Sequence, residues 1–345
     1  MTTLAAEALD LAATREWLTR QGIRVNGPLQ AKLIEGGLSN LTFFLSDSGG
    51  NRWVLRRPPL GNVLITAHDV GRECRVLAAL ADTPVPVPKI IGSDIDAHGT
   101  PYYVMEEVAG VVLRDADQAS SLKKPALRRT GKALIEGLAK LHQVDPTEVG
   151  LERLGRGEDY LARQIVMWQA QAEHYRVAPA TAAEAVRDRL LDSLPPQRDT
   201  TLVHGDYKLD NVLVDERGEV AAILDWELCT RGDPLVDVAV CAYYWTEPSD
   251  PVQPFERPPS ALEGMPSRAE LLDHYAAITG RNIDRLDYYF AYAAWRLALV
   301  FEGVIGRSQA GAYGTHDTHE ESRLQGIVTD LIGEAETFLA KDDRA

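Results

Sequence analysis

The segment from Leu202 to Asp237 reads LVHGDYKLDNVLVDERGEVAAILDWELCTRGDPLVD. Three short apolar runs, typical of β-strands, alternate in this segment with polar turns. An acidic or amide side chain lies near one end of each run, and these side chains are Asp206, Asn211 and Asp225. The segment therefore brings two carboxylates and one amide into a short stretch of strands and turns.

The spacing of these side chains is that of the protein-kinase catalytic loop, H-x-D-x-x-x-x-N, followed by a strand and a metal-binding Asp. In phosphoryl transfer one carboxylate orients and deprotonates the attacking hydroxyl, while an amide and a second carboxylate hold the metal ions. This predicts Asp206 as the catalytic base and Asn211 and Asp225 as Mg²⁺ ligands. An ordinary β-hairpin is the alternative, because Asp, Asn and Gly are common in turns. Four matches, His204 included, favour the kinase-like site.

The composition is that of an ordinary globular protein. The chain has 345 residues, enough for two lobes with separate cores, and 45% of them are hydrophobic and 25% charged. Its net charge of −15 disfavours a nucleic-acid partner, because phosphate backbones require a basic surface. The same charge disfavours docking on anionic membranes.

The cysteines and the N-terminus indicate the compartment. Cys74, Cys229 and Cys241 form neither a CxxC pair nor a zinc pattern, so we expect reduced structural thiols. The N-terminal segment lacks the basic start and apolar core of a signal peptide. No apolar run approaches the roughly 18 residues of a membrane span. We therefore expect a cytoplasmic protein without a membrane partner.

The first part of the chain has the pattern of a small β-rich lobe. Its expected strands are residues 29–34, 41–45, 51–56, a strand beginning at 89–91, and 102–105, and its expected helices are residues 8–21 and 68–80. Between the first two strands, Gly36 and Gly37 make a turn that Ser39 and Asn40 follow. Such a turn lets backbone N–H groups approach phosphates closely, although a plain hairpin has the same glycines. Its place ahead of the catalytic loop favours a turn that covers the nucleotide.

A kinase also needs a cation on the third strand to hold the α- and β-phosphates. Here WVLR ends in Arg56, where a kinase would have lysine, and arginine can grip phosphate bidentately. The neighbouring Arg57 is the alternative, and strand alternation points the two side chains to opposite faces. The kinase register favours Arg56. Glu73 on the next helix is placed to pair with it, the alternative being a solvated surface glutamate.

The strand at 102–105 is followed by the segment that would join the two lobes. In a kinase, backbone C=O and N–H groups of this hinge form hydrogen bonds with the edge of the adenine base. The position predicts that Glu106 and Val108 supply these groups and that Met105 closes the back of the pocket.

From about residue 110 the pattern becomes helical. Expected helices include one ending near His142 and the segments 159–172 and 182–194, and the C-terminal part at 268–339 is helical again. A long Pro-rich loop at 243–266 is either a lid or an insertion. We assign His142 and the aromatic residues of 288–295 to the core. The expected fold is α+β and bilobal like a protein kinase, with a nucleotide-binding lobe at 1–107 and a larger, mostly helical lobe at 108–345.

The motifs HGDYKLDN at 204–211, ILDWE at 223–227 and GDPLVDVA at 232–239 resemble those of the aminoglycoside phosphotransferase family, which shares the kinase fold. Within it, EGGLSNLTF, WVLRRPPLG, REC and EGVIGR resemble the branch associated with acyl-CoA dehydrogenases. The resemblance implies ATP and Mg²⁺ as cofactors and a hydroxyacyl-CoA-like or other small-molecule acceptor. It further implies that Lys208 contacts the γ-phosphate and that His204 and Asp237 support the catalytic loop.

The expected activity is therefore ATP-dependent phosphorylation of a hydroxyl group on a small molecule. A protein substrate is not expected, because only the eleven residues 226–236 separate Asp225 from Asp237, too few for a peptide-docking activation segment. Two alternatives remain open. One is a kinase of aminoglycoside antibiotics. The other is a nucleotide-binding pseudokinase, and the presence of Arg56 where a kinase has lysine is consistent with it.

Overall fold

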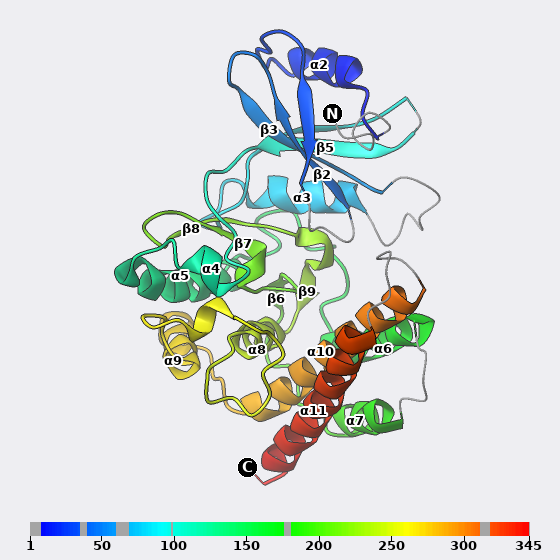
Figure 1. Ribbon diagram of the computed structural model, residues 1–345, viewed down its shortest axis with the longest axis vertical. Coiled ribbons are helices and arrows are strands. Elements are labelled where there is room, and N and C mark those ends of the chain that lie inside the picture. The colour runs from blue at the N-terminus through cyan, green and yellow to red at the C-terminus, as the bar shows by residue number, and fades with distance from the viewer. Residues whose placement is uncertain are drawn as a thin grey trace.

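The computed structural model describes residues 8–34, 40–59, 69–97, 99–175, 181–310 and 318–344. A sheet-based N-terminal lobe lies above a larger helical C-terminal lobe (Figure 1). This arrangement confirms the predicted α+β, kinase-like bilobal fold. The last strand of the N-terminal sheet ends at Glu106, close to the predicted boundary after residue 107.

The N-terminal lobe is built on an antiparallel sheet of five strands in the order β1-β2-β3-β5-β4. The strands are β1 (Gln30–Leu33), β2 (Leu41–Ser46), β3 (Arg52–Arg57), β4 (Ile90–Ile95) and β5 (Pro101–Glu106). Helix α2 (Leu11–Arg20) packs on one face and helix α3 (Val70–Leu80) on the other. Strand alternation divides β3 between these faces, because Leu55 packs with the α2 cluster and Val54 with the α3 cluster.

The C-terminal lobe is mostly helical. Its helices are α4 (Ala116–Ala119), α5 (Lys124–His142), α6 (Tyr160–Tyr175), α7 (Thr181–Asp192), α8 (Pro234–Tyr244), α9 (Arg268–Thr279), α10 (Leu286–Gln309) and α11 (Thr318–Asp342). Helices α10 and α11 lie side by side along this lobe (Figure 1). No helix in the described ranges combines the length and the apolar character needed to cross a membrane.

Two short antiparallel strand pairs carry the segment quoted first. Strand β6 (Thr201–Val203) pairs with β9 (Thr230–Gly232), and β7 (Val212–Val214) pairs with β8 (Val220–Ile223). The three predicted apolar runs are thus strands, whereas β9 was not predicted. The Pro-rich loop is shorter than predicted, because α8 extends to Tyr244 and a 3-10 turn forms at Pro259–Ala261.

Of the side chains that the sequence assigned to the core, Phe290 is only partly buried and the others are buried. They include the three cysteines, which are free thiols, together with His142, Tyr288, Tyr289, Tyr292 and Trp295. These aromatic side chains of α10 pack in one cluster with residues of α6, α7, α8 and α11.

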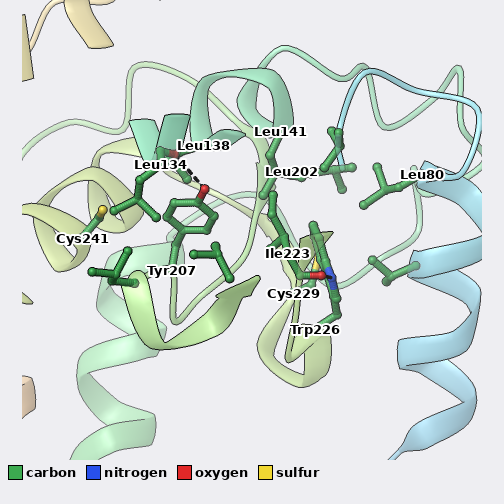
Figure 2. Packing of buried hydrophobic residues seen from close by; sticks show 14 of the residues in the cluster. Leu80, Leu134, Leu138, Leu141, Leu202, Tyr207, Ile223, Trp226, Cys229 and Cys241 are labelled. Atoms are coloured by element: carbon green, nitrogen blue, oxygen red, sulfur yellow. Dashed lines mark hydrogen bonds between the residues drawn. The ribbon is translucent and has the colours of Figure 1, made fainter. Parts of the chain in front are cut away.

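Tyr207 fixes the catalytic loop to α5. Its ring is fully buried against Leu134 and Leu138, and its hydroxyl donates a 2.7 Å hydrogen bond to the carbonyl of Leu134 (Figure 2). A buried tyrosine needs such a partner for its hydroxyl. Gly137 makes room for it, since a Cβ at that position would lie 2.7 Å from the Tyr207 hydroxyl.

Gly137→Ala should lower the free energy of unfolding by about 1–3 kcal/mol, the usual cost of overpacking a core. The matched control is Gly333→Ala in α11, where a Cβ meets nothing within 4 Å and the position is exposed. There the substitution should raise the free energy of unfolding by about 0.5–1 kcal/mol, because alanine favours helix. Urea denaturation of both variants measures the difference, and effects of the same sign would contradict the packing described.

Candidate active site

A buried carboxylate holds the catalytic turn in place. Asp237, in the first turn of α8, accepts the backbone N–H of His204 at 2.6 Å and that of Gly205 at 2.9 Å. Burial alone would raise the pKa of Asp237, but the neighbouring His142 and the backbone donor lower it below its usual value. The predicted support of the loop by Asp237 is thus present as two hydrogen bonds to its backbone.

His204 connects the turn to the next strand. Its ring is completely buried, and Nε2 donates to the carbonyl of Leu224 at 2.8 Å. Leu224 in turn donates its N–H to the carbonyl of Asn211 at 2.8 Å. These bonds place Asn211 next to the residue that precedes Asp225, although 14 positions separate Asn211 and Asp225 in the sequence.

Asp206 lies at the centre of a set of polar contacts. Its Oδ2 accepts from Lys208 Nζ at 2.5 Å and from Asn211 Nδ2 at 3.0 Å, and its Oδ1 accepts from Arg296 Nη2 at 2.7 Å. Burial alone would raise the pKa of Asp206, but the charges of Lys208 and Arg296 lower it well below its usual value. The carboxylate is therefore ionised at neutral pH and can accept a hydrogen bond from a hydroxyl group.

Arg296 is the site residue that the sequence analysis missed. It comes from the middle of α10, 90 residues after Asp206. One signal was present in the sequence, since Arg296 is the only charged residue in the stretch YYFAYAAWRLALVF at 288–301. A single charge on a helix with a core pattern is seldom buried without a partner.

The predicted metal ligands are Asn211 and Asp225. Mg²⁺ prefers oxygen ligands and is commonly held by one or two carboxylates together with substrate phosphates. Asn211 uses its Nδ2 to bind Asp206, which leaves its amide oxygen for a metal, and the Asp225 side chain is 35% exposed. Within the described ranges, no three His, Cys, Asp or Glu side chains form a ready metal cluster. The donor set fits a metal that takes its other ligands from phosphates and water.

Arg56 faces the site, as the register predicted. Its Nε donates to Glu73 at 2.9 Å and its Nη2 donates to Asp225 at 2.7 Å. Burial raises the pKa of Glu73, and the Arg56 charge opposes that rise. Arg57 points to the opposite face of the sheet, where it contacts the carbonyl of Ala8 and lies 3.2 Å from Asp96. Arg56 is thus the strand cation that reaches a predicted metal ligand.

A second arginine joins α3 to the C-terminal lobe. Arg72 donates Nη1 to the carbonyl of Glu227 at 3.0 Å and Nη2 to that of Cys229 at 2.6 Å. Both carbonyls lie in the segment directly after Asp225. Helix α3 is therefore bonded to the segment that carries the predicted metal ligand.

A cavity of about 690 Å³ lies between the two lobes, within the usual size of small-molecule sites. The predicted residues among those that line it are Arg56, Glu73, Met105, Glu106, Val108, Asn211 and Asp225. The N–H of Glu106 already donates to the carbonyl of Lys89 at 2.9 Å, so the group that Glu106 can offer a base is its own carbonyl. The cavity thus joins the predicted hinge to the predicted metal ligands.

The remaining predicted cofactor-binding residues and Lys208 are not among the described residues that line this cavity. Gly36, Gly37 and Ser39 fall outside the described residues, and Asn40 is buried and does not line this cavity as described. Lys208 lies beside a smaller cavity of about 50 Å³, and its ammonium group is 5.0 Å from the centre of the Tyr244 ring. Its contact in the structure is with Asp206, and the contact with a γ-phosphate stays a prediction.

The comparison with protein families agrees with this geometry. The model of the phosphotransferase enzyme family, APH, matches residues 30–296, a range that contains every predicted site residue. The chain belongs to this APH family. Its match ends at Arg296, so the rest of α10 and α11 lie outside it.

Several proteins are similar to this APH-family chain. Acyl-CoA dehydrogenase family member 10 of Mus musculus is 33% identical over 320 residues, which cover 90% of this chain but only 29% of that relative's length. A solved structure from Ralstonia eutropha JMP134, provisionally named an aminoglycoside phosphotransferase, is 28% identical with a TM-score of 0.78, and the match covers 95% of this chain and 98% of that one. Amicoumacin kinase hAmiN, solved with AMP-PNP, Ca²⁺ and Ami, has the same fold at 17% identity, with a TM-score of 0.57 and coverage of 97% and 96%.

Arg56→Met should weaken binding of Mg-ATP about tenfold or more, because a hydrogen bond to a charged group is worth about 1.5–3 kcal/mol. The matched control is the adjacent Arg57→Met on the other face of the sheet, which should leave the affinity within about twofold. Isothermal titration calorimetry on the two folded variants measures both. Unchanged affinity in Arg56→Met would show that Arg56 does not hold the nucleotide.

Proposed function

We propose that this phosphotransferase uses ATP to phosphorylate a hydroxyl group of a small molecule. The observation that carries the proposal is the hydrogen bond from Asn211, which lines the nucleotide-sized cavity, to the carboxylate of Asp206. The APH family supplies the reaction class. The nucleotide, the metal and the type of acceptor are part of the proposal.

In the proposed complex ATP occupies the 690 Å³ cavity with its base against Glu106 and Val108. Asn211 and Asp225 would hold Mg²⁺, which supplies positive charge to the phosphates when bound. Arg56 would neutralise further negative charge on the phosphates. The complex of amicoumacin kinase, a protein of the same fold, with AMP-PNP and Ca²⁺ supports the choice of a nucleotide and a divalent cation.

The reaction needs an acceptor hydroxyl between Asp206 and the γ-phosphorus. As the bond from the acceptor oxygen to phosphorus forms, the bond from phosphorus to the β,γ-bridging oxygen breaks and ADP leaves. The hydroxyl proton passes to the Asp206 carboxylate. Because such transition states are loose, catalysis depends mainly on positioning and on charge neutralisation.

The charges near Asp206 bear on the class of acceptor. Lys208 and Arg296 contact its two oxygens, and Arg114 and Lys208 line the adjacent 50 Å³ cavity, whose one carboxylate among the described lining residues is Asp210. Cations beside the reacting hydroxyl disfavour a polyamine such as an aminoglycoside and favour a neutral or anionic acceptor. We therefore place an anionic acceptor, such as a hydroxyacyl-CoA-like compound, first.

The test is transfer of the γ-phosphate of Mg-ATP to a panel of hydroxyacyl-CoAs, simple hydroxy acids, aminoglycosides and amino alcohols. Transfer to the anionic compounds supports the proposal in full. Transfer to aminoglycosides alone would reverse the acceptor assignment. Nucleotide binding with no transfer to any compound would favour the pseudokinase alternative.

Asp206→Asn should lower kcat at least about 100-fold, in the range usual for loss of a general base, while Mg-ATP affinity stays within about threefold. Asparagine is preferable to alanine because it leaves a polar partner for the buried Arg296. Steady-state kinetics with the accepted substrate, together with calorimetry, separate the two quantities. A variant with nearly wild-type kcat would contradict the assignment of Asp206 as the base.

Asp225→Asn should behave differently, because its carboxylate is proposed to bind the metal. We expect the gain in ATP affinity on adding Mg²⁺ to fall about tenfold or more, the loss of a charged ligand being worth at least about 1.4 kcal/mol. Calorimetry with and without Mg²⁺ measures this gain directly. An unchanged Mg²⁺ dependence would show that Asp225 is not a metal ligand.

A further inference from the structure

Arg296 is a buried charge in the middle of a core helix. Its side chain is only 2% exposed, and its neighbours Trp295 and Leu297 on α10 are buried apolar residues. Burying a guanidinium group costs several kcal/mol even after the structure relaxes, so a specific compensating partner is required. The partner is Asp206, whose Oδ1 accepts from Arg296 Nη2 at 2.7 Å.

The guanidinium group of Arg296 also packs on an aromatic ring. Its central carbon lies 4.6 Å from the centre of the Trp168 ring on α6. Arginine stacks well on aromatic rings because its guanidinium group is planar. Such stacking restricts the rotation of the guanidinium plane. Helices α6 and α10 pack against each other, so Trp168 and Arg296 belong to the same packed part of the lobe.

The contacts to Asp206 differ in origin. Lys208 and Asn211 bind Oδ2, and both belong to the same loop as Asp206, so they move with it. Arg296 binds Oδ1 from the helical body. The terminal torsion of an aspartate is broad and has no sharp preference of its own. An external donor is therefore needed to fix the plane of this carboxylate relative to the rest of the lobe.

We propose that Arg296 is a positioning residue for phosphoryl transfer, which fixes the plane of the Asp206 carboxylate against α10 so that it stays aimed at the acceptor hydroxyl. This inference rests on the proposed function. Arg296 does not itself contact substrate and acts through Asp206. Trp168 supports it by holding the guanidinium plane.

A purely structural ion pair between α10 and the catalytic loop is the alternative. The contacts of Arg296 argue against it, because its Nε is buried without a hydrogen-bond partner in the part of the chain that the structure describes. An arginine buried for stability alone would be expected to use more of its donors. A directed bond to Asp206 from a side chain whose Nε stays unbonded within the described residues suits orientation better than stability.

The experiment compares Arg296→Met with a matched control, Arg285→Met, at the residue just before the same helix. Arg285 precedes α10, pairs with the buried Asp342 and lies 5.9 Å from the Tyr288 ring. It thus has the same kinds of contact as Arg296, an acidic partner and an aromatic ring, away from the site. Both variants are measured for kcat, for KM of Mg-ATP and of the acceptor found in the panel, and for urea denaturation.

We expect kcat of Arg296→Met to fall about 100-fold, the usual loss when one oriented donor is removed, while KM for Mg-ATP changes less than about threefold. Arg285→Met should lose comparable stability but keep kcat within about twofold. Wild-type kcat in Arg296→Met, or an equal loss of kcat in Arg285→Met, would overturn the inference and leave the proposed function intact. A wild-type protein that transfers phosphate to nothing would overturn the proposed function itself and this inference with it.

Trp168→Leu decides the question if Arg296→Met does not fold. This substitution removes the ring that orients the guanidinium group but leaves no buried charge unpaired, and Trp168 is only partly buried. We expect kcat to fall about fivefold, which corresponds to a stacking contact of about 1 kcal/mol. A folded Trp168→Leu protein with wild-type kcat would overturn the inference.

Discussion

The hydrogen bonds from two backbone N–H groups to the buried carboxylate of Asp237 are the constraint on which the site depends. They fix the turn that carries Asp206, while Tyr207, bonded to α5, fixes the same turn from the other side. A buried carboxylate is costly unless its oxygens are satisfied, and here the backbone donors satisfy both oxygens. From this fixed turn the chain runs through Asn211 to β7 and β8, so the position of Asp225 follows from it.

The charged side chains of the site form two series in which positive and negative groups alternate, and not isolated pairs. Glu73, Arg56 and Asp225 are linked in that order, and Lys208, Asp206 and Arg296 are linked in the same alternating way. Each buried charge has neighbours of opposite sign, which keeps the desolvation cost tolerable. The first series lines the cavity between the lobes, and the second is joined to it through the bond from Asn211 to Asp206. Negative charge added by phosphates would therefore enter a site whose cations are already oriented.

Local spacing explains how much of this could be predicted from the sequence. The catalytic loop is specified by residues a few positions apart. Strand alternation placed Arg56 and Arg57 on opposite faces, and the kinase register then favoured Arg56. Arg296 could not be found this way, because its contact spans 90 residues and its helix has the pattern of a core helix. Strand β9 was missed for a similar reason, since the three residues Thr230–Gly232 extend only through pairing with β6. Contacts between distant elements depend on packing, which spacing does not encode.

The bonds of Arg72 have a mechanical consequence. Because α3 donates to the carbonyls of Glu227 and Cys229, this helix is fastened to the large lobe although it precedes β4 and β5 in the sequence. A rotation of the sheet that carried α3 with it would have to break both of these hydrogen bonds, worth about 1.5–3 kcal/mol each because the donor is charged. A rotation that left α3 in place would still have to break the bond from Arg56 on β3 to Asp225. The sheet and α3 are therefore tied separately to the segment around Asp225, and opening the cleft requires breaking at least one of these links.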